Sequence, residues 1–177
     1  YAGYFTPLNG YTYVRNNIFA HSGGGKALFT SHPYNMVSDY NMLYSSGAVL
    51  VELSTPPPGF ESIGNWKAAT YANLQAWRDA YSWDVNSIVY KPAFISEMDL
   101  QPNLANPEVW AMHGRGVQIA GNDYDFNNAP RPTTLTAGVP DLGAYEFVPT
   151  AIPPVLTAIP AAPAAGSARR TARCAGS

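Results

Sequence analysis

Two short units in the first 45 residues place asparagine directly before apolar residues. They are NNIF at 16–19 and YNML at 40–43, so that Asn17 and Asn41 are 24 residues apart. Periods of about 20–50 residues are typical of solenoids, in which each coil buries its inner face by stacking on the next. Asparagine suits the corner of a coil, because it tolerates left-handed backbone geometry and hydrogen-bonds neighbouring amides. The spacing predicts a stacked repeat, and two unrelated loops that each contain asparagine are the alternative.

Composition favours β-structure. Charged residues make up 12% of the chain, whereas about 25% is usual in globular domains. Asn, Ser, Thr, Gly and Tyr take their place, and such residues suit strands and turns better than solvated helices. We therefore expect an all-β chain, with strand-like pieces at residues 11–20, 27–44, 47–53, 85–96, 116–120 and 140–147.

One segment has the pattern of a helix, residues 71–81 (YANLQAWRDAY). Thr70 can cap its N-terminus, and Leu74, Trp77 and Tyr81 fall on one face. We expect this helix to cover part of the stack with Trp77. The alternative role for Trp77 is an aromatic platform for a ligand.

The chain divides into two parts near residue 147. Residues 148–177 are rich in Pro and Ala and almost free of large apolar residues after Ile159, which predicts a disordered linker or tail. Residues 1–147 hold 7 Lys or Arg and 12 Asp or Glu, a net charge of −5. An acidic body of this kind argues against nucleic-acid binding, which needs a concentrated basic face.

Segments for export and membrane insertion are not evident. No apolar run approaches the roughly 20 residues that span a bilayer, so we expect no membrane span. The chain begins at Tyr1 without Met, and we expect an N-terminal segment with any export signal to be missing. A single cysteine, Cys174, excludes an internal disulfide framework.

Five segments in a fixed order carry a resemblance to a known family. They are VRNNIFAHSGGG, SDYNMLYSSG, LQAWRDAYSWDVNSI, KPAFIS, and an ending that combines Asp125, Arg131 and Pro132 with PDLGAYEF at 140–147. Over residues 14–147 the chain resembles the C-terminal portion of bacterial right-handed parallel β-helix repeat proteins, in the pectin-lyase-like superfamily. It departs from the family pattern after Asp125, where Phe126 and Asn127 replace the usual Asp–Gly turn, and at YSWD, which replaces a shorter turn.

The resemblance implies a fold and a function. The fold would be a right-handed parallel β-helix over residues 1–147, consisting of its C-terminal coils, a terminal cap and one short covering helix. The function would be that of a secreted or cell-surface monomer that binds or processes extracellular polysaccharide. The alternative is a non-enzymatic, adhesin-type structural solenoid.

A search of the residues for catalytic and metal-binding patterns gives one weak candidate. Asp123, Asp125 and Asn127 occupy alternate positions, as the oxygen ligands of a calcium-binding loop do. No Glu follows at the spacing of an EF-hand. The alternative is a turn rich in Asp and Asn. His21, His32 and His113 show no metal-ligand spacing, and we expect them to be loop residues. We predict that the chain itself is not catalytic.

The remaining candidates are a cap and a carbohydrate-contacting surface. Arg131 with Asp141 or Glu146 is expected to form a structural ion pair that pins the last coil, and a catalytic pair is the alternative. The first 45 residues are rich in tyrosine, and tyrosine rings stack on sugars while their hydroxyl groups form hydrogen bonds. The candidate glycan contacts are Tyr11, Tyr13, Tyr40 and Tyr44.

Overall fold

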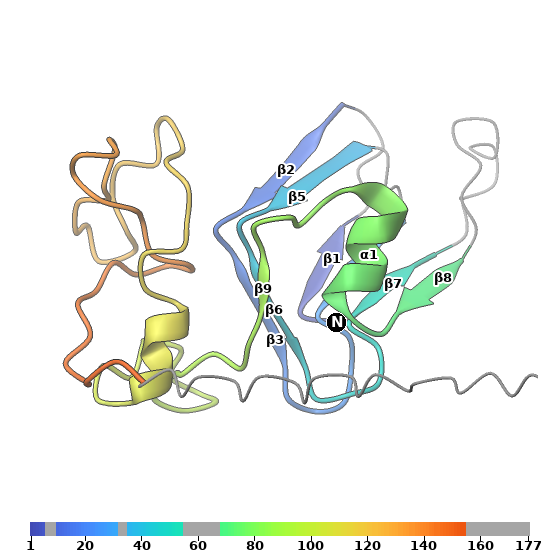
Figure 1. Ribbon diagram of the computed structural model, residues 1–177, viewed down its shortest axis with the longest axis horizontal. Coiled ribbons are helices and arrows are strands. Elements are labelled where there is room, and N and C mark those ends of the chain that lie inside the picture. Colours follow the sequence, from blue (N-terminus) through green and yellow to red (C-terminus); the bar gives the residue numbers. More distant parts are fainter. Residues whose placement is uncertain (6–9, 32–34, 55–67, 155–177) are drawn as a thin grey trace, which may run out of the picture.

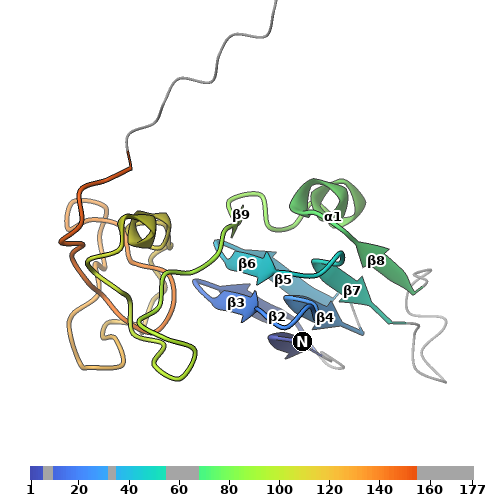
Figure 2. The same ribbon diagram turned by 90° about the horizontal axis from the view of Figure 1, so that it is seen from below.

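The computed structural model describes residues 1–5, 10–31, 35–54 and 68–154 (Figure 1). Within these ranges the short strands form three sheets, whose members lie one above another (Figure 2). The first sheet contains, in order, β1 (Gly3–Phe5), β4 (Leu28–Thr30), β7 (Val51–Leu53) and β8 (Ala69–Tyr71). The second contains β2 (Thr12–Arg15) and β5 (Met36–Asp39). The third contains β3 (Ile18–His21), β6 (Met42–Ser45) and β9 (Ile88–Val89).

Strand pairing follows the predicted period. Thr12 pairs with Met36 and Ile18 pairs with Met42, so that both sheets have an offset of 24 residues. All strand pairs are parallel except that of β7 with β8, which is antiparallel. The prediction of an all-β chain with parallel sheets is confirmed, and the right-handed β-helix stays a prediction.

The asparagine corners form a ladder between successive turns of the chain. The Asn41 side-chain oxygen accepts hydrogen bonds from the Asn17 backbone N–H at 3.0 Å and from the Asn17 side-chain amide at 3.2 Å. In the following turn of the chain a serine takes the place of the asparagine, and the Asn41 backbone N–H donates to Ser87 Oγ at 2.8 Å. Left-handed geometry falls one residue earlier than predicted, at Asn16 (φ 59°) and Tyr40 (φ 55°). The side chains of Asn17 and Asn41 therefore serve as rungs.

The interior between the three sheets is apolar. Side chains that alternate along each strand point inward, as the period of two in a strand requires. The buried residues of this first core are Val14, Ala27, Leu28, Met36, Leu43, Leu50, Val51, Leu74 and Trp77.

Helix α1 (Leu74–Tyr81) covers the end of this core beyond β6 and β7 (Figure 2). The predicted start of the helix is wrong, because Thr70 lies in β8 and Asn73 is the N-cap. The Asn73 side chain accepts a hydrogen bond from the Ala76 N–H at 2.9 Å. Trp77 has an exposed fraction of 0%, so it cannot be a ligand platform and instead seals the core.

A buried aspartate ties α1 to the stack. Asp84 accepts hydrogen bonds from Trp77 Nε1 at 2.8 Å, Ser38 Oγ at 2.9 Å, Ser87 Oγ at 2.6 Å and the Asn41 side-chain amide at 3.3 Å. Its exposed fraction is 0%. Local sequence gives no sign of this role, because aspartate is common in ordinary turns.

Residues 91–154 form a second lobe beside the third sheet (Figures 1 and 2). They include a 3-10 helix, η2 (Pro107–Ala111). Ile18, Met42 and Ile88 on the outer face of the third sheet pack in the core of this lobe, with Val109 and Met112. The lobe attaches to the side of the stack because β3, β6 and β9 present apolar side chains on their outer face, at the point where the chain leaves β9.

The strands expected at residues 116–120 and 140–147 are absent from the lobe as the structure describes it. Isolated backbone hydrogen bonds replace them, among them Gly116 N–H to the Pro140 carbonyl at 2.7 Å and Leu142 N–H to the Met112 carbonyl at 3.0 Å. Prolines at 130, 132 and 140 interrupt any continuous ladder, because proline has no N–H to donate.

The expected tail begins inside the lobe. Thr150 and Ala151 donate their backbone N–H groups to the Leu104 carbonyl at 3.0 and 2.9 Å, so this part of the segment is held. Most of the predicted tail, from residue 155 onward, lies outside the described residues. Among the described helices, none has the length and apolar character needed to cross a bilayer.

Candidate functional site

The four tyrosines predicted to contact glycan do not share one site. Tyr11 and Tyr13 are 69% and 64% exposed near β2, and the Arg15 guanidinium lies 5.3 Å from the centre of the Tyr13 ring. Tyr40 and Tyr44 are partly buried. Tyr44 belongs to the third sheet, where it is in register with Ala20. Tyr11 and Tyr13 are therefore the exposed members of this set. Ala20, the partner of Tyr44 in the sheet, lines a groove that forms a separate surface.

One wall of a groove in that region is the glycine-rich turn after β3. The His21 ring nitrogen Nδ1 accepts backbone N–H groups from Gly23 at 3.3 Å and Gly25 at 3.1 Å. Close packing requires glycine, because a Cβ on Gly25 would lie 2.5 Å from His21 Nε2. His21 was expected in a loop but is the last residue of β3, and its side chain shapes the turn that carries Ser22 and Gly23 at the rim.

The opposite wall is a tight loop that follows β9. Phe94 and Pro102 form an antiparallel bridge, and the Ile95 N–H donates to the Gln101 carbonyl at 2.9 Å. Ser96 Oγ closes the tip by accepting the N–H groups of Met98 at 3.2 Å and Asp99 at 3.0 Å. Glu97 therefore sits at the tip of a loop with a defined backbone.

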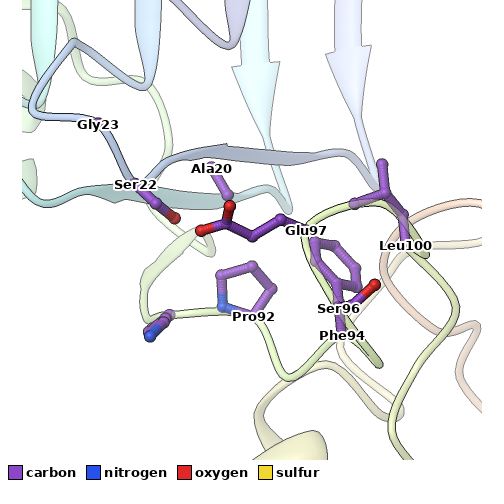
Figure 3. A pocket seen from close by; sticks show the side chains of 9 residues that line it. Ala20, Ser22, Gly23, Pro92, Phe94, Ser96, Glu97 and Leu100 are labelled. Atoms are coloured by element: carbon purple, nitrogen blue, oxygen red, sulfur yellow. The ribbon is translucent and has the colours of Figure 1, made fainter.

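The groove between these walls has a volume of about 560 Å³. Glu97 reaches across the opening toward Ser22, and Pro92, Phe94 and Leu100 supply apolar surface (Figure 3). Lys91 also lines the groove. Volumes of roughly 300–1,000 Å³ with apolar walls and a few polar groups are typical of small-molecule sites.

A second hollow of about 450 Å³ continues the surface, because Phe94 and Leu100 line both. It adds Phe126, which is 78% exposed, and Tyr145, whose ring meets that of Phe126 edge-on at 5.8 Å. The combined surface is aromatic and polar along its length. Such surfaces match sugars, whose ring faces stack on aromatic side chains and whose hydroxyl groups form hydrogen bonds.

Glycoside hydrolysis uses two carboxyl groups separated by about 5–10 Å, one on each side of the bond that is cleaved. Within the part of the chain that the structure describes, Glu97 is the single acidic residue that lines the groove. A lone carboxylate can still accept hydrogen bonds from neighbouring sugar hydroxyl groups.

The predicted cap residues meet in the lobe. Arg131 is buried and pairs with Glu146 at 2.5 Å, while its other terminal nitrogen donates to the Gly143 carbonyl at 2.9 Å. Asp141 is 1% exposed and accepts backbone N–H groups from Gly114 at 2.6 Å and Phe147 at 2.8 Å. The cluster lies beside the stack, whereas we expected it over the last coil, whose end is covered by α1.

Burial controls the acidity of this cluster. It raises the pKa of Asp141, and burial together with the charge of Asp141 raises the pKa of Glu146 to about 7. Arg131 and the Asp141 N–H act in the opposite direction on Glu146 but do not outweigh burial. Near neutral pH, Glu146 is therefore close to its titration midpoint.

Of the predicted calcium ligands, Asp125 has both carboxylate oxygens engaged by backbone N–H groups. Asp125 Oδ1 accepts N–H groups from Asn127 at 2.8 Å and Ala129 at 2.7 Å, and Oδ2 accepts from Glu146 at 2.9 Å. These bonds lower the pKa of Asp125 against the effect of burial. Asp123 is exposed, and the described residues contain no group of three or more His, Cys, Asp or Glu side chains that could hold a metal ion. The arrangement is that of an Asp- and Asn-rich turn.

Sequence reasoning missed Glu97 as a candidate binding residue. Its segment, KPAFIS, was interpreted as a strand, and the carboxylate follows directly after it. A signal was available at the end of that segment, because its last residue, Ser96, and Asp99 lie three positions apart, a spacing typical of a tight turn.

Comparison of the chain with protein-family models, curated proteins and solved structures gave no match.

Proposed function

We propose that this chain forms the C-terminal coils of a secreted or cell-surface right-handed parallel β-helix that binds extracellular polysaccharide. The parallel pairs β2–β5 and β3–β6, each with an offset of 24 residues, support the fold. So does the side-chain ladder from Asn17 through Asn41 to Ser87, since stacked corners are a general device of solenoids.

The observation that carries the binding function is the position of Glu97 in the groove. Its carboxylate faces the opening beside the apolar surface of Pro92 and Phe94 (Figure 3). A carboxylate can accept hydrogen bonds from adjacent hydroxyl groups of one sugar while the ring packs on apolar side chains. Lys91 balances the charge of Glu97, which favours neutral sugar units in this groove.

The test is calorimetric titration of the purified chain with a neutral hexasaccharide such as cellohexaose. We expect Glu97→Ala to weaken binding at least fivefold, because a sugar hydroxyl pair loses its charged acceptor. Asp79→Asn, at an exposed position of α1, is the matched control and should bind as the unmodified chain does. Binding that is unchanged in Glu97→Ala would contradict the groove as the site.

A second candidate function is a structural, adhesin-type solenoid. Among the described residues, β1, β2 and β3 each pair with one strand only, and these edges lie at the same end of the stack (Figure 2). Open edges of parallel sheets accept further strands. Failure of the chain to bind any neutral or acidic polysaccharide in a panel would favour this candidate.

A further inference from the structure

A separate pocket of about 830 Å³ lies where β9 enters the second lobe. Tyr90 follows β9, and Pro107 and Trp110 belong to η2. Apolar side chains supply most of the lining, and the two charged residues in it, Glu108 and Arg115, have opposite signs. Because these charges balance, the pocket matches an uncharged, apolar occupant better than an anion or a cation.

A proline-rich stretch of the chain, residues 149–154 (PTAIPP), is held beside this pocket in the manner of a bound peptide. Thr150 donates its backbone N–H at 3.0 Å and its hydroxyl group at 2.9 Å to the Leu104 carbonyl. The Ala151 N–H donates to the same oxygen at 2.9 Å. Trp110 Nε1 in turn donates to the Ala151 carbonyl at 2.9 Å. The stretch is therefore bound through both its N–H groups and a carbonyl.

Proline-rich segments have a backbone that suits this kind of contact. In the polyproline II conformation no hydrogen bonds form within the segment, so its carbonyls stay free to accept from a partner and its side chains pack in grooves lined by aromatic rings. Trp110 supplies such a donor, and its ring packs edge-on against that of His113 at 5.3 Å. Tyr90, which is 39% exposed, adds a second aromatic surface to the pocket. The pocket thus combines a donor with aromatic walls.

The chain reaches this pocket at Pro154, which is the last described residue and is itself part of the lining. The sequence that follows, residues 155–160 (VLTAIP), has no charged side chain and includes the large apolar residues Leu156 and Ile159. A segment that starts at the rim of a pocket needs no connecting loop to reach it, so its effective concentration there is high. Its sequence matches the apolar lining and the balanced charge.

We propose that residues 155–160 of this chain occupy the pocket and pack against Tyr90 and Trp110. The contact continues the one that Trp110 already makes with Ala151. The predicted tail, which we expected to begin at residue 148, would then be attached to the lobe as far as Pro160. The inference concerns a contact within the chain and does not depend on the proposed polysaccharide binding.

Limited digestion of the full chain with thermolysin tests the proposal, because this protease cleaves before large apolar residues such as Leu156. A docked bond is cut only while the segment is out of the pocket, so we expect cleavage before Leu156 to be about tenfold slower than in a synthetic peptide of residues 153–163. Tyr90→Ala removes one wall of the pocket, and the cleavage should accelerate about fivefold. Tyr124→Ala is the matched control, because Tyr124 is 60% exposed and lies outside the pocket.

A second variant changes the segment and leaves the pocket intact. Ile159→Asp places a charge against apolar walls, which is unfavourable, so cleavage before Leu156 should again accelerate about fivefold. The reference for this variant is the synthetic peptide with the same substitution. Trypsin cleavage after Arg169, which lies beyond the proposed contact, should proceed at the same rate in every variant.

Three outcomes would overturn the proposal. The first is cleavage before Leu156 that is as fast in the full chain as in the peptide, a comparison that needs no variant. The second is a cleavage rate that changes in neither Tyr90→Ala nor Ile159→Asp. The third is binding of the synthetic peptide to the unmodified chain with a shift of the Trp110 indole N–H signal in an NMR titration, which would mean that the pocket is open to a separate proline-rich partner.

Discussion

At Glu146, two opposing influences act on one carboxyl group. The Arg131 guanidinium lies 2.5 Å away and favours the charged form, whereas burial and the nearby Asp141 charge favour the neutral form and raise the pKa to about 7. A short ion pair does not by itself keep a buried carboxyl group ionised, because burial disfavours the charged form.

A pH dependence of stability follows for Glu146. Because its pKa is higher in the folded chain than the ordinary value of 4.5, the folded chain binds the Glu146 proton more tightly than the unfolded chain does. Its stabilising effect is therefore complete below about pH 4.5 and is lost as the pH rises through 7. With solvent screening, we expect a loss of about 1–2 kcal/mol.

The melting temperature, measured between pH 4.5 and 8, reports this effect. In Glu146→Gln, which cannot titrate at this position, the melting temperature should change much less with pH over the same range. Asp141, whose pKa is also raised, should leave a residual slope of the same sign. A profile in Glu146→Gln as steep as that of the unmodified chain would contradict the assignment.

At the scale of single elements, α1 shows how local and distant contacts combine. Its one buried face, Leu74 and Trp77, is encoded at helical spacing. Its attachment to the stack depends on Asp84, which joins Trp77 to residues of β5 and the asparagine ladder. The helix is thus both an apolar lid and a hydrogen-bonded one.

Trp77→Ala should lower the free energy of unfolding by about 3–5 kcal/mol, because it leaves a large cavity in the core. Trp77→Phe retains most of the ring but removes the donor to Asp84, and we expect a smaller loss of about 1–3 kcal/mol. Urea unfolding measures both. Tyr13→Ala, at a position that is 64% exposed, is the control, and a loss as large as that of Trp77→Ala would remove the lid argument.

At the scale of the whole molecule, Asn16 joins the stack to the second lobe. Its side-chain oxygen accepts the Val117 N–H at 2.8 Å, its amide donates to the Val117 carbonyl at 2.8 Å, and its backbone carbonyl accepts the Gly143 N–H at 2.8 Å. Asn16 is 6% exposed and has a φ of 59°. Glycine can keep this backbone geometry without the side-chain bonds.

Asn16→Gly should therefore loosen the lobe and spare the stack. We expect the Val117 amide to exchange its hydrogen at least tenfold faster, with little change at the amides of β3 and β6. Asn128→Gly is the matched control, because Asn128 has a φ of 63° but is exposed. Equal acceleration throughout the chain would mean that stack and lobe unfold together.

The periodicity of the sequence was enough to predict the 24-residue repeat and the covering role of Trp77. Composition favoured the all-β class, and the expectation of parallel sheets came from the family resemblance. The tertiary structure decided where the lobe attaches, that Glu146 rather than Asp141 pairs with Arg131, and which side chains line the groove and the pocket. These features join residues as far apart as Asn16 and Val117, which are separated by 101 positions. Such contacts depend on the path of the chain through space, and no local pattern encodes that path.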